Sequence, residues 1–175
     1  MAADALWYEA AHVVGITNAL NVVADALDGQ GAAIGLTAVD EAAASGELAS
    51  VFADMRSFHG STTVPEVFRR LAHDPAYLAD FWQAHRRAFD DNRLTRRLKE
   101  ALAYAVSVTT RSRFGTGFHL AEMRRLGIGE RGVMEVLGVT QMFSSYTKIA
   151  DTLQLESDMA AIAPVDRSPA PGGGG

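Results

Sequence analysis

The chain has 175 residues, of which 48% are apolar and 21% charged, a composition typical of a single globular domain with a sizeable core. Its formal net charge of −5 argues against a nucleic-acid partner, because duplex binding needs clustered Lys and Arg. It contains no cysteine, which excludes disulfides and thiolate metal sites.

The amino terminus and the hydropathy pattern predict a cytoplasmic protein. The first twelve residues are acidic and lack the positively charged region that begins a signal peptide. We count no apolar run that approaches the ~20 residues of a membrane span. We therefore expect no membrane partner.

Helical periodicity dominates the first half of the chain, and no period-two strand pattern occurs anywhere. A wide apolar stripe predicts a helix over residues 4–27. Residues 28–39 follow as a glycine-rich loop without the spacing of a phosphate-binding loop. Ser45 is a candidate cap for a helix over 45–58. A short helix is expected after Pro65, and another is marked by apolar residues over 78–89.

The stretch 98–127 predicts two helices joined by a short break. Apolar residues recur at three- and four-residue steps on either side of a hydroxyl-rich segment, 109–112. Ser and Thr side chains compete for backbone hydrogen bonds and weaken a helix there. Gly127 fits the left-handed cap that ends the second helix.

A last apolar helix is predicted over 131–153, with Gly138 dividing it into two pieces. Residues 156–175 carry three prolines and end in a glycine run, which predicts a disordered tail. The expected architecture is thus an all-α single domain over residues 1–155, with its core in 45–155.

Two ionisable residues stand out within 98–127, Glu100 and His119. A buried carboxylate or imidazole is costly unless it is paired, so we expect the two side chains to meet. A carboxylate that holds an imidazole fixes its tautomer and makes it a general base near neutral pH. The same pair could equally be a purely structural, satisfied polar contact.

The region around this pair resembles the core of the alkylhydroperoxidase D-like (AhpD-like) and carboxymuconolactone decarboxylase superfamily. The family pattern is Glu, eleven residues, Cys, two residues, Cys, three residues, His, and Glu100 and His119 match its ends without a gap. The flank His-Leu-Ala-Glu-Met-Arg-Arg-Leu-Gly from His119 to Gly127 agrees as well. The string VPEVFRRLAHDPAYLADFWQAHRRAF resembles the peroxidase-related branch and extends the likeness, which covers roughly Ser45 to Leu155.

The resemblance implies an AhpD-like helical bundle with catalytic Glu100 and His119. Its two cysteine positions hold Ser112 and Gly115, so the redox couple of the peroxidase branch is absent. Ser112 could hold a substrate oxygen or merely cap a helix, and Gly115 could leave a pocket where sulfur sits in relatives. The aromatics Phe114, Phe118 and Tyr146 are core residues or, together with Ser112 and Gly115, line a substrate pocket.

Three functions are compatible with these residues. The first is a cofactor-independent acid–base enzyme, of decarboxylase or isomerase type, acting on a small organic molecule through the Glu–His pair. The second is a catalytically silent scaffold or small-molecule binder, and the third is residual peroxidase activity, which the missing cysteines argue against. Glu9 and His12 have the Glu-x-x-His spacing of di-iron bundles, but no second such pair exists, so we expect neither metal nor cofactor.

Assembly is expected from the apolar stripes of the first and last helices. Members of this superfamily commonly form dimers, trimers or hexamers. Residues 4–27 and 131–153 carry more apolar surface than a monomer of this size leaves in water. We therefore expect a homo-oligomer.

Overall fold

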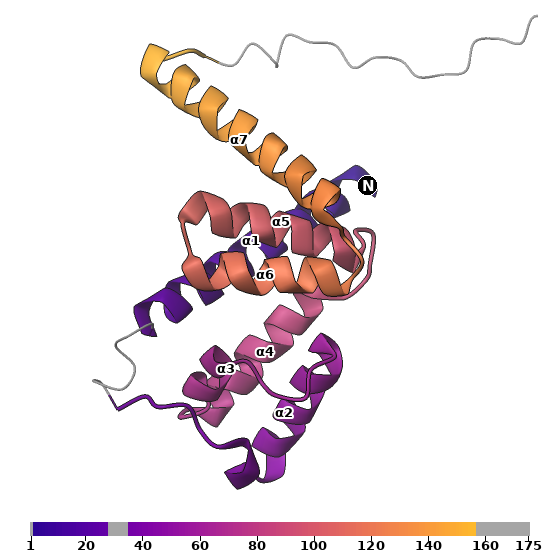
Figure 1. Cartoon of the computed structure of the whole chain (residues 1–175), viewed down its shortest axis with the longest axis vertical. Helices are drawn as coiled ribbons and strands as arrows, with labels where there is room; N and C mark the ends of the chain where they lie inside the picture. The colour runs from indigo at the N-terminus through magenta and orange to yellow at the C-terminus, as the bar shows by residue number, and fades with distance from the viewer. Residues whose placement is uncertain (1, 28–34, 157–175) are drawn as a thin grey trace, which may run out of the picture. The chain divides into compact units, whose positions relative to one another are not determined.

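A computed structural model describes residues 2–27 and 35–156, and within these ranges the secondary structure is entirely helical, which confirms the all-α prediction (Figure 1). The elements, in chain order, are α1 (Ala2–Leu27), a short 3₁₀ helix (Glu41–Ala43), α2 (Gly46–His59), α3 (Glu66–Leu71), α4 (Pro75–Phe89), α5 (Arg96–Thr110), α6 (Arg113–Arg125) and α7 (Glu130–Leu153).

The chain divides into two compact units, Met1–Thr140 and Gln141–Gly175. The expectation of one domain over residues 1–155 stays a prediction. Most of the expected glycine-rich loop, residues 28–34, and of the expected disordered tail, residues 157–175, lies outside the described residues.

Side-chain caps begin the helices that carry the site. Asp74 caps α4 by accepting the Tyr77 N–H at 3.0 Å, and Thr95 accepts the Leu98 N–H at 3.4 Å at the start of α5. The expected break between the two helices of 98–127 consists of two residues, Arg111 and Ser112, and Arg111 is in the left-handed conformation with φ 61°. Gly127, as expected, is left-handed with φ 81°.

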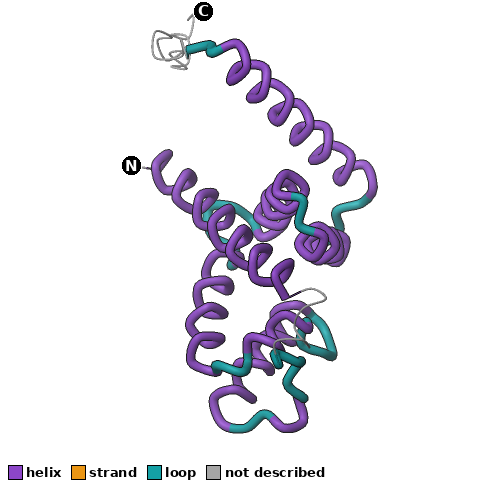
Figure 2. The backbone as a smooth tube through the Cα atoms, turned by 90° about the vertical axis from the view of Figure 1, so that its left-hand side faces the viewer, coloured by secondary structure: helices purple, strands orange, loops and turns teal. Residues whose placement is uncertain are grey.

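Helices α5 and α6 form an antiparallel pair, and α1 packs along both of them (Figures 1 and 2). Helix α1 also contacts α4 and α3, while α2 packs on α4. Near the start of α1, Glu9 accepts the backbone N–H groups of Arg93 and Leu94 at 3.2 and 3.0 Å. Glu9 therefore fixes the segment that leads into α5.

Two apolar clusters make up the core of the unit Met1–Thr140. One centres on Phe52, Phe68 and Trp82 between α2, α3 and α4, and the other includes Phe89 of α4 and Ala103 of α5. Phe58 packs against both clusters. The candidate site lies where the two clusters approach one another.

Two details of the long helices differ from expectation. Helix α7 runs without interruption through Gly138, because a helix tolerates an isolated glycine at a cost of only about 1 kcal/mol. Within α1, the stretch Leu6–Leu27 is long and apolar enough to cross a membrane by length and composition. The expectation that no apolar run approaches the length of a membrane span was therefore wrong. One such helix near the amino terminus is weak evidence, and α1 packs against other helices of the chain.

Candidate functional site: a buried carboxylate–imidazole pair

Glu100 of α5 and His119 of α6 meet in the interior, as the sequence predicted. The His119 Nδ1–H donates to Glu100 Oε2 across 2.8 Å, and both residues are at most 1% exposed. The contact forms because the two-residue break at Arg111 and Ser112 turns α6 back along α5. The other ring nitrogen of His119, Nε2, is buried and has no hydrogen-bond partner among the described residues.

The imidazole ring of His119 is held between two aromatic rings. Phe89 stacks on it with ring centroids 5.7 Å apart, and Phe118 meets it edge-on at 5.1 Å. These rings belong to different parts of the core, since Phe89 is in one apolar cluster and Phe118 packs against the other. The ring orientation of His119 is therefore fixed by packing as well as by Glu100.

Arg96 connects this pair to a second carboxylate, Glu122. Its guanidinium donates to Glu122 Oε2 at 2.7 Å and lies 3.6 Å from Glu100 Oε1. It also donates to the Phe58 carbonyl at 2.8 Å and stacks over the Phe58 ring at 3.5 Å. One partly buried arginine thus compensates two buried carboxylates.

Glu122 is in turn approached by His59 and Arg125. The His59 Nδ1 lies 3.3 Å from Glu122 Oε2 without the geometry of a hydrogen bond, whereas Arg125 donates to both carboxylate oxygens at 2.7 and 3.1 Å. Burial by itself would raise the pKa of the Glu122 carboxyl, but His59 and Arg125 outweigh it and lower the pKa to about 2. Glu122 is therefore ionised at neutral pH.

A third histidine, His85, completes the buried cluster. Its ring stacks between Trp82 and Phe89, with centroid distances of 5.4 and 4.7 Å. Burial lowers the pKa of His85 well below 6.5, and the nearby His59 and His119 lower it further. Among the described residues, no three acidic, histidine or cysteine side chains converge as metal ligands would.

Ser112 takes the cap role that the sequence offered as one of its two possibilities. It is buried at the start of α6, and its Oγ accepts the Gly115 N–H at 3.0 Å. The empty space expected at Gly115 does not exist. Asn21 of α1 and Ser107 of α5 fill it, and a Cβ at Gly115 would lie 2.0 Å from Asn21 Oδ1 and 2.4 Å from Ser107 Oγ.

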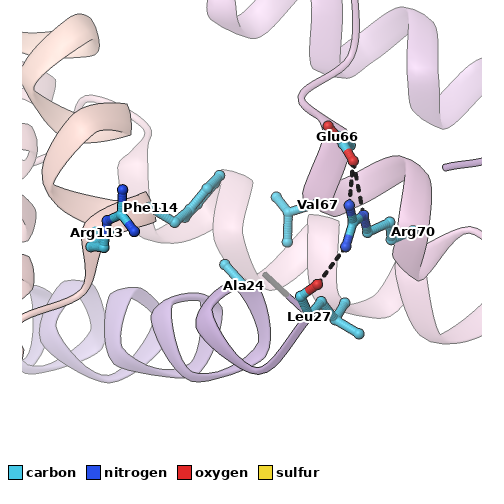
Figure 3. Close-up of a pocket in the computed structure, with 7 residues that line it drawn as sticks. All are labelled: Ala24, Leu27, Glu66, Val67, Arg70, Arg113 and Phe114. Carbon is cyan, nitrogen blue, oxygen red and sulfur yellow. Dashed lines mark hydrogen bonds and ion pairs between the residues drawn. The ribbon is translucent and has the colours of Figure 1, made fainter. Parts of the chain in front are cut away.

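The three candidate aromatics occupy different environments. Phe118 is half-buried beside His119, and Phe114 stacks on Phe118 at 5.4 Å. Phe114 also lines a cavity of about 320 Å³, which Figure 3 shows. Tyr146 is exposed on α7, in the unit Gln141–Gly175, and its assignment to a substrate site stays a prediction.

Sequence reasoning missed four residues of this network, Arg96, Glu122, His59 and Asn21. A spacing signal was present for two of them, because Arg96 is four residues before Glu100 and Glu122 is three residues after His119. Each therefore shares a helix face with one member of the pair. Asn21 was visible as a polar interruption of the apolar stripe of α1.

The comparisons with known proteins agree with this fold. The sequence profile of the Carboxymuconolactone decarboxylase family matches residues 75–155, which contain α4 to α7. The crystal structure of an alkylhydroperoxidase AhpD core from Rhodospirillum rubrum superimposes with a TM-score of 0.63 at 26% identity, over 67% of this chain and 88% of that one. A comparison with curated proteins gives no match.

The chain thus combines an AhpD-like, all-helical fold with a buried carboxylate–imidazole pair and no cysteine. The chain is similar to the AhpD-like and carboxymuconolactone decarboxylase superfamily, through the family match over residues 75–155 and through the shared AhpD-like fold. The chain contains no cysteine, and Ser112 and Gly115 occupy the two positions at which the family motif has cysteines.

Proposed function

We propose that the protein is a cofactor-independent acid–base enzyme, of decarboxylase or isomerase type, that acts on a small organic substrate through His119 and Glu100. The observation that carries the proposal is the 2.8 Å contact between Glu100 Oε2 and His119 Nδ1, together with the unpartnered Nε2 on the other side of the ring. Buried polar atoms normally have a hydrogen-bond partner. A ring nitrogen that lacks one among the described residues, on a histidine oriented by a carboxylate, therefore supports a catalytic role.

The carboxylate assigns the proton positions of the imidazole. Glu100 accepts from Nδ1–H, so Nε2 of the neutral ring carries the free electron pair and acts as the base. In an isomerisation, Nε2 would take a proton from one carbon and return it to another. In a decarboxylation, the bond to the carboxylate carbon breaks, carbon dioxide leaves, and the electron pair stays on the substrate. For this step His119 starts as the imidazolium, so its Nε2–H gives the proton to that carbon and the neutral ring then takes a new proton from solvent.

Access to Nε2 needs movement of an aromatic side chain. His119 is fully buried, and the half-buried Phe118 contacts its ring edge-on. We infer that Phe118 swings aside when a substrate enters. Moving Phe118 costs less free energy than moving Phe89, because Phe89 is fully buried in the core and Phe118 is only half-buried.

The test uses a panel of small carboxylated lactones and keto acids that includes carboxymuconolactone, the compound in the name of the matched family. Release of carbon dioxide and isomer formation are measured for wild type, His119→Ala and Glu100→Gln. We expect kcat to fall about 10²–10⁴-fold in both variants, the range typical of lost general acid–base catalysis, with the helical circular dichroism unchanged.

The exposed histidine variant His12→Ala is the matched control and should retain full activity. Full activity in His119→Ala and Glu100→Gln would show that the pair is structural and would contradict the proposal.

A second candidate function, a catalytically silent scaffold or small-molecule binder, is favoured by one observation. His119 is 0% exposed, and burial of this kind also suits a purely structural pair. Mass spectrometry of the protein purified under native conditions distinguishes the two functions. A retained small molecule, with no turnover of any panel member, would favour the binder.

A further inference from the structure

Helices α1, α3 and α6 surround a cavity of about 320 Å³ in the unit Met1–Thr140 (Figure 3). This volume is at the lower end of the ~300–1,000 Å³ range of ligand pockets, so its occupant would be small. The lining residues are Ala24, Leu27, Glu66, Val67, Arg70, Arg113 and Phe114. None of these belongs to the buried pair at Glu100 and His119.

The walls of the cavity are apolar on opposite sides. Figure 3 shows Phe114 of α6 on one side and Val67 of α3 on the other, with Ala24 of α1 between them at the base. Phe114 is half-buried, so part of its ring remains available for contact. A flat or short apolar group between these walls would be removed from water, which is the usual source of affinity in small-molecule sites.

The charged groups at the cavity differ in how well they are compensated. Arg70 donates to Glu66 Oε1 and to the Leu27 carbonyl, so its charge and its donors are already engaged. Arg113 is exposed and makes no ion pair or side-chain hydrogen bond within the part of the chain that the structure describes, and Figure 3 draws none between it and the other lining residues. Two guanidiniums and one carboxylate leave the cavity with one unbalanced positive charge.

Arg113 also occupies an unfavourable position in its own helix. It is the first residue of α6, where the helix dipole is positive, and the first turn of α6 contains no acidic residue. A bound anion would be attracted by the guanidinium and by the end of the helix together. The unmatched charge therefore lies beside the apolar walls and fits a ligand that has both an anionic and an apolar part.

We propose that this cavity is a binding site for a small organic monoanion, such as a monocarboxylate, with its apolar body between Phe114 and Val67 and its charge on Arg113. The site is separate from the buried pair but adjacent to it. Phe114 stacks on Phe118 at 5.4 Å, and Phe118 contacts His119 at 5.1 Å. That the monoanion is also the substrate rests on the proposed function, whereas the binding itself does not.

The experiment measures the binding of benzoate to the full chain by isothermal titration calorimetry, with benzamide as the neutral compound of the same shape. Methyl NMR of the wild-type protein locates the ligand. We expect benzoate to bind more tightly than benzamide, to bind more weakly as salt is raised, and to show NOEs to the methyl groups of Val67. Arg113→Met keeps an apolar stem and should weaken benzoate binding on the order of tenfold, as expected for loss of a charge-assisted contact.

Arg124→Met is the matched control, because Arg124 is exposed on the same helix and does not line the cavity. It should bind benzoate as wild type does. His119→Ala and Glu100→Gln should also retain benzoate binding, which separates this site from the proposed reaction. Equal affinity for benzamide, unchanged binding in Arg113→Met, no benzoate binding by wild type, or loss of binding in His119→Ala would each overturn the proposal.

Discussion

The side-chain amide of Asn21 occupies the space next to Gly115, so that a Cβ at Gly115 would lie only 2.0 Å from Asn21 Oδ1. Asn21 comes from α1 and donates to Ser107 Oγ of α5 at 3.0 Å, while Ser107 donates to the Ala103 carbonyl at 2.8 Å. Glycine at position 115 is thus required by the packing of three helices. The position that holds a thiol in the family motif has become a helix contact.

Restoring the two thiols should therefore fail unless the neighbours are trimmed. We expect Ser112→Cys with Gly115→Cys to cost about 1–3 kcal/mol of stability, as overpacking does, and to remain reduced under mild oxidant. Adding Asn21→Ala and Ser107→Ala should make room and allow an intramolecular disulfide at the start of α6. Thiol titration and mass spectrometry without reductant measure the outcome.

The pair Asn21→Ala and Ser107→Ala without cysteines is the control for stability. Complete oxidation of the double cysteine variant in the untrimmed background would contradict the packing argument.

This contact also shows where prediction from sequence ends. Helical periodicity predicted the fold class, because it is a local pattern along single helices. The buried pair was predicted because Glu100 and His119 lie on two helices joined by a short break. The filling of the space at Gly115 depends on α1, which is about ninety residues away in sequence. No local sequence pattern indicates that the Asn21 side chain lies next to Gly115.

The compensation of the two carboxylates was only partly visible in the sequence, because the spacing between Arg96 and Glu100 does not show which way Arg96 points. Arg96 falls in a run of basic residues over 93–99, a pattern typical of a solvated helix face. The structure places Arg96 inward, over the Phe58 ring, whereas Arg97 is exposed. The difference between neighbouring arginines follows from helix phase relative to the core, which requires the tertiary arrangement.

Loss of Arg96 should destabilise the fold strongly. Arg96→Met keeps the apolar stem but leaves Glu100 and Glu122 with less positive charge nearby, and removal of one partner from a buried ion pair typically costs about 3–5 kcal/mol. Urea unfolding measures the loss. Arg97→Met is the control and should change stability by no more than about 0.5 kcal/mol.

The stability contributed by Glu122 should depend on pH in a defined direction. Its folded pKa of about 2 is below the ordinary value of 4.5, so the contribution is present above pH 4.5 and is lost as the pH falls toward 2. We expect the difference in unfolding free energy between wild type and Glu122→Gln to shrink over this interval. The change should be no more than about 2 kcal/mol after allowance for solvent screening at the partly exposed Arg125. A difference that stays constant from pH 5 to pH 2.5 would contradict the depressed pKa.

His85 should destabilise the protein on mild acidification. Its folded pKa is well below 6.5, so as the pH falls below 6.5 the unfolded chain binds a proton that the folded protein does not. Wild type should then lose up to about 1.4 kcal/mol per pH unit relative to His85→Phe, whose ring stacks on Phe89 without titrating. Unfolding curves at pH 8 and pH 5.5 test this, and equal pH dependence of the two proteins would refute it.

The last prediction concerns α7, which has no buried residue in the described chain. Exposed apolar side chains recur along it at alternating steps of three and four, the spacing of a coiled-coil seam. The seam residues are Val139, Met142, Tyr146, Ile149 and Leu153, each about half exposed or more. A seam of this kind is rarely left in water, so we expect α7 to pair with the same helix of a second copy of the chain.

Sedimentation velocity at micromolar concentration should accordingly show a homo-oligomer. Tyr146→Lys with Ile149→Lys places two charges in the seam and should dissociate the oligomer, because a desolvated, unpaired ammonium group is costly. Gln141→Lys with Thr147→Lys adds the same charge at exposed positions of α7 outside the seam and should leave the assembly intact. A wild-type monomer, or equal dissociation in the two double variants, would show that the seam does not hold copies together.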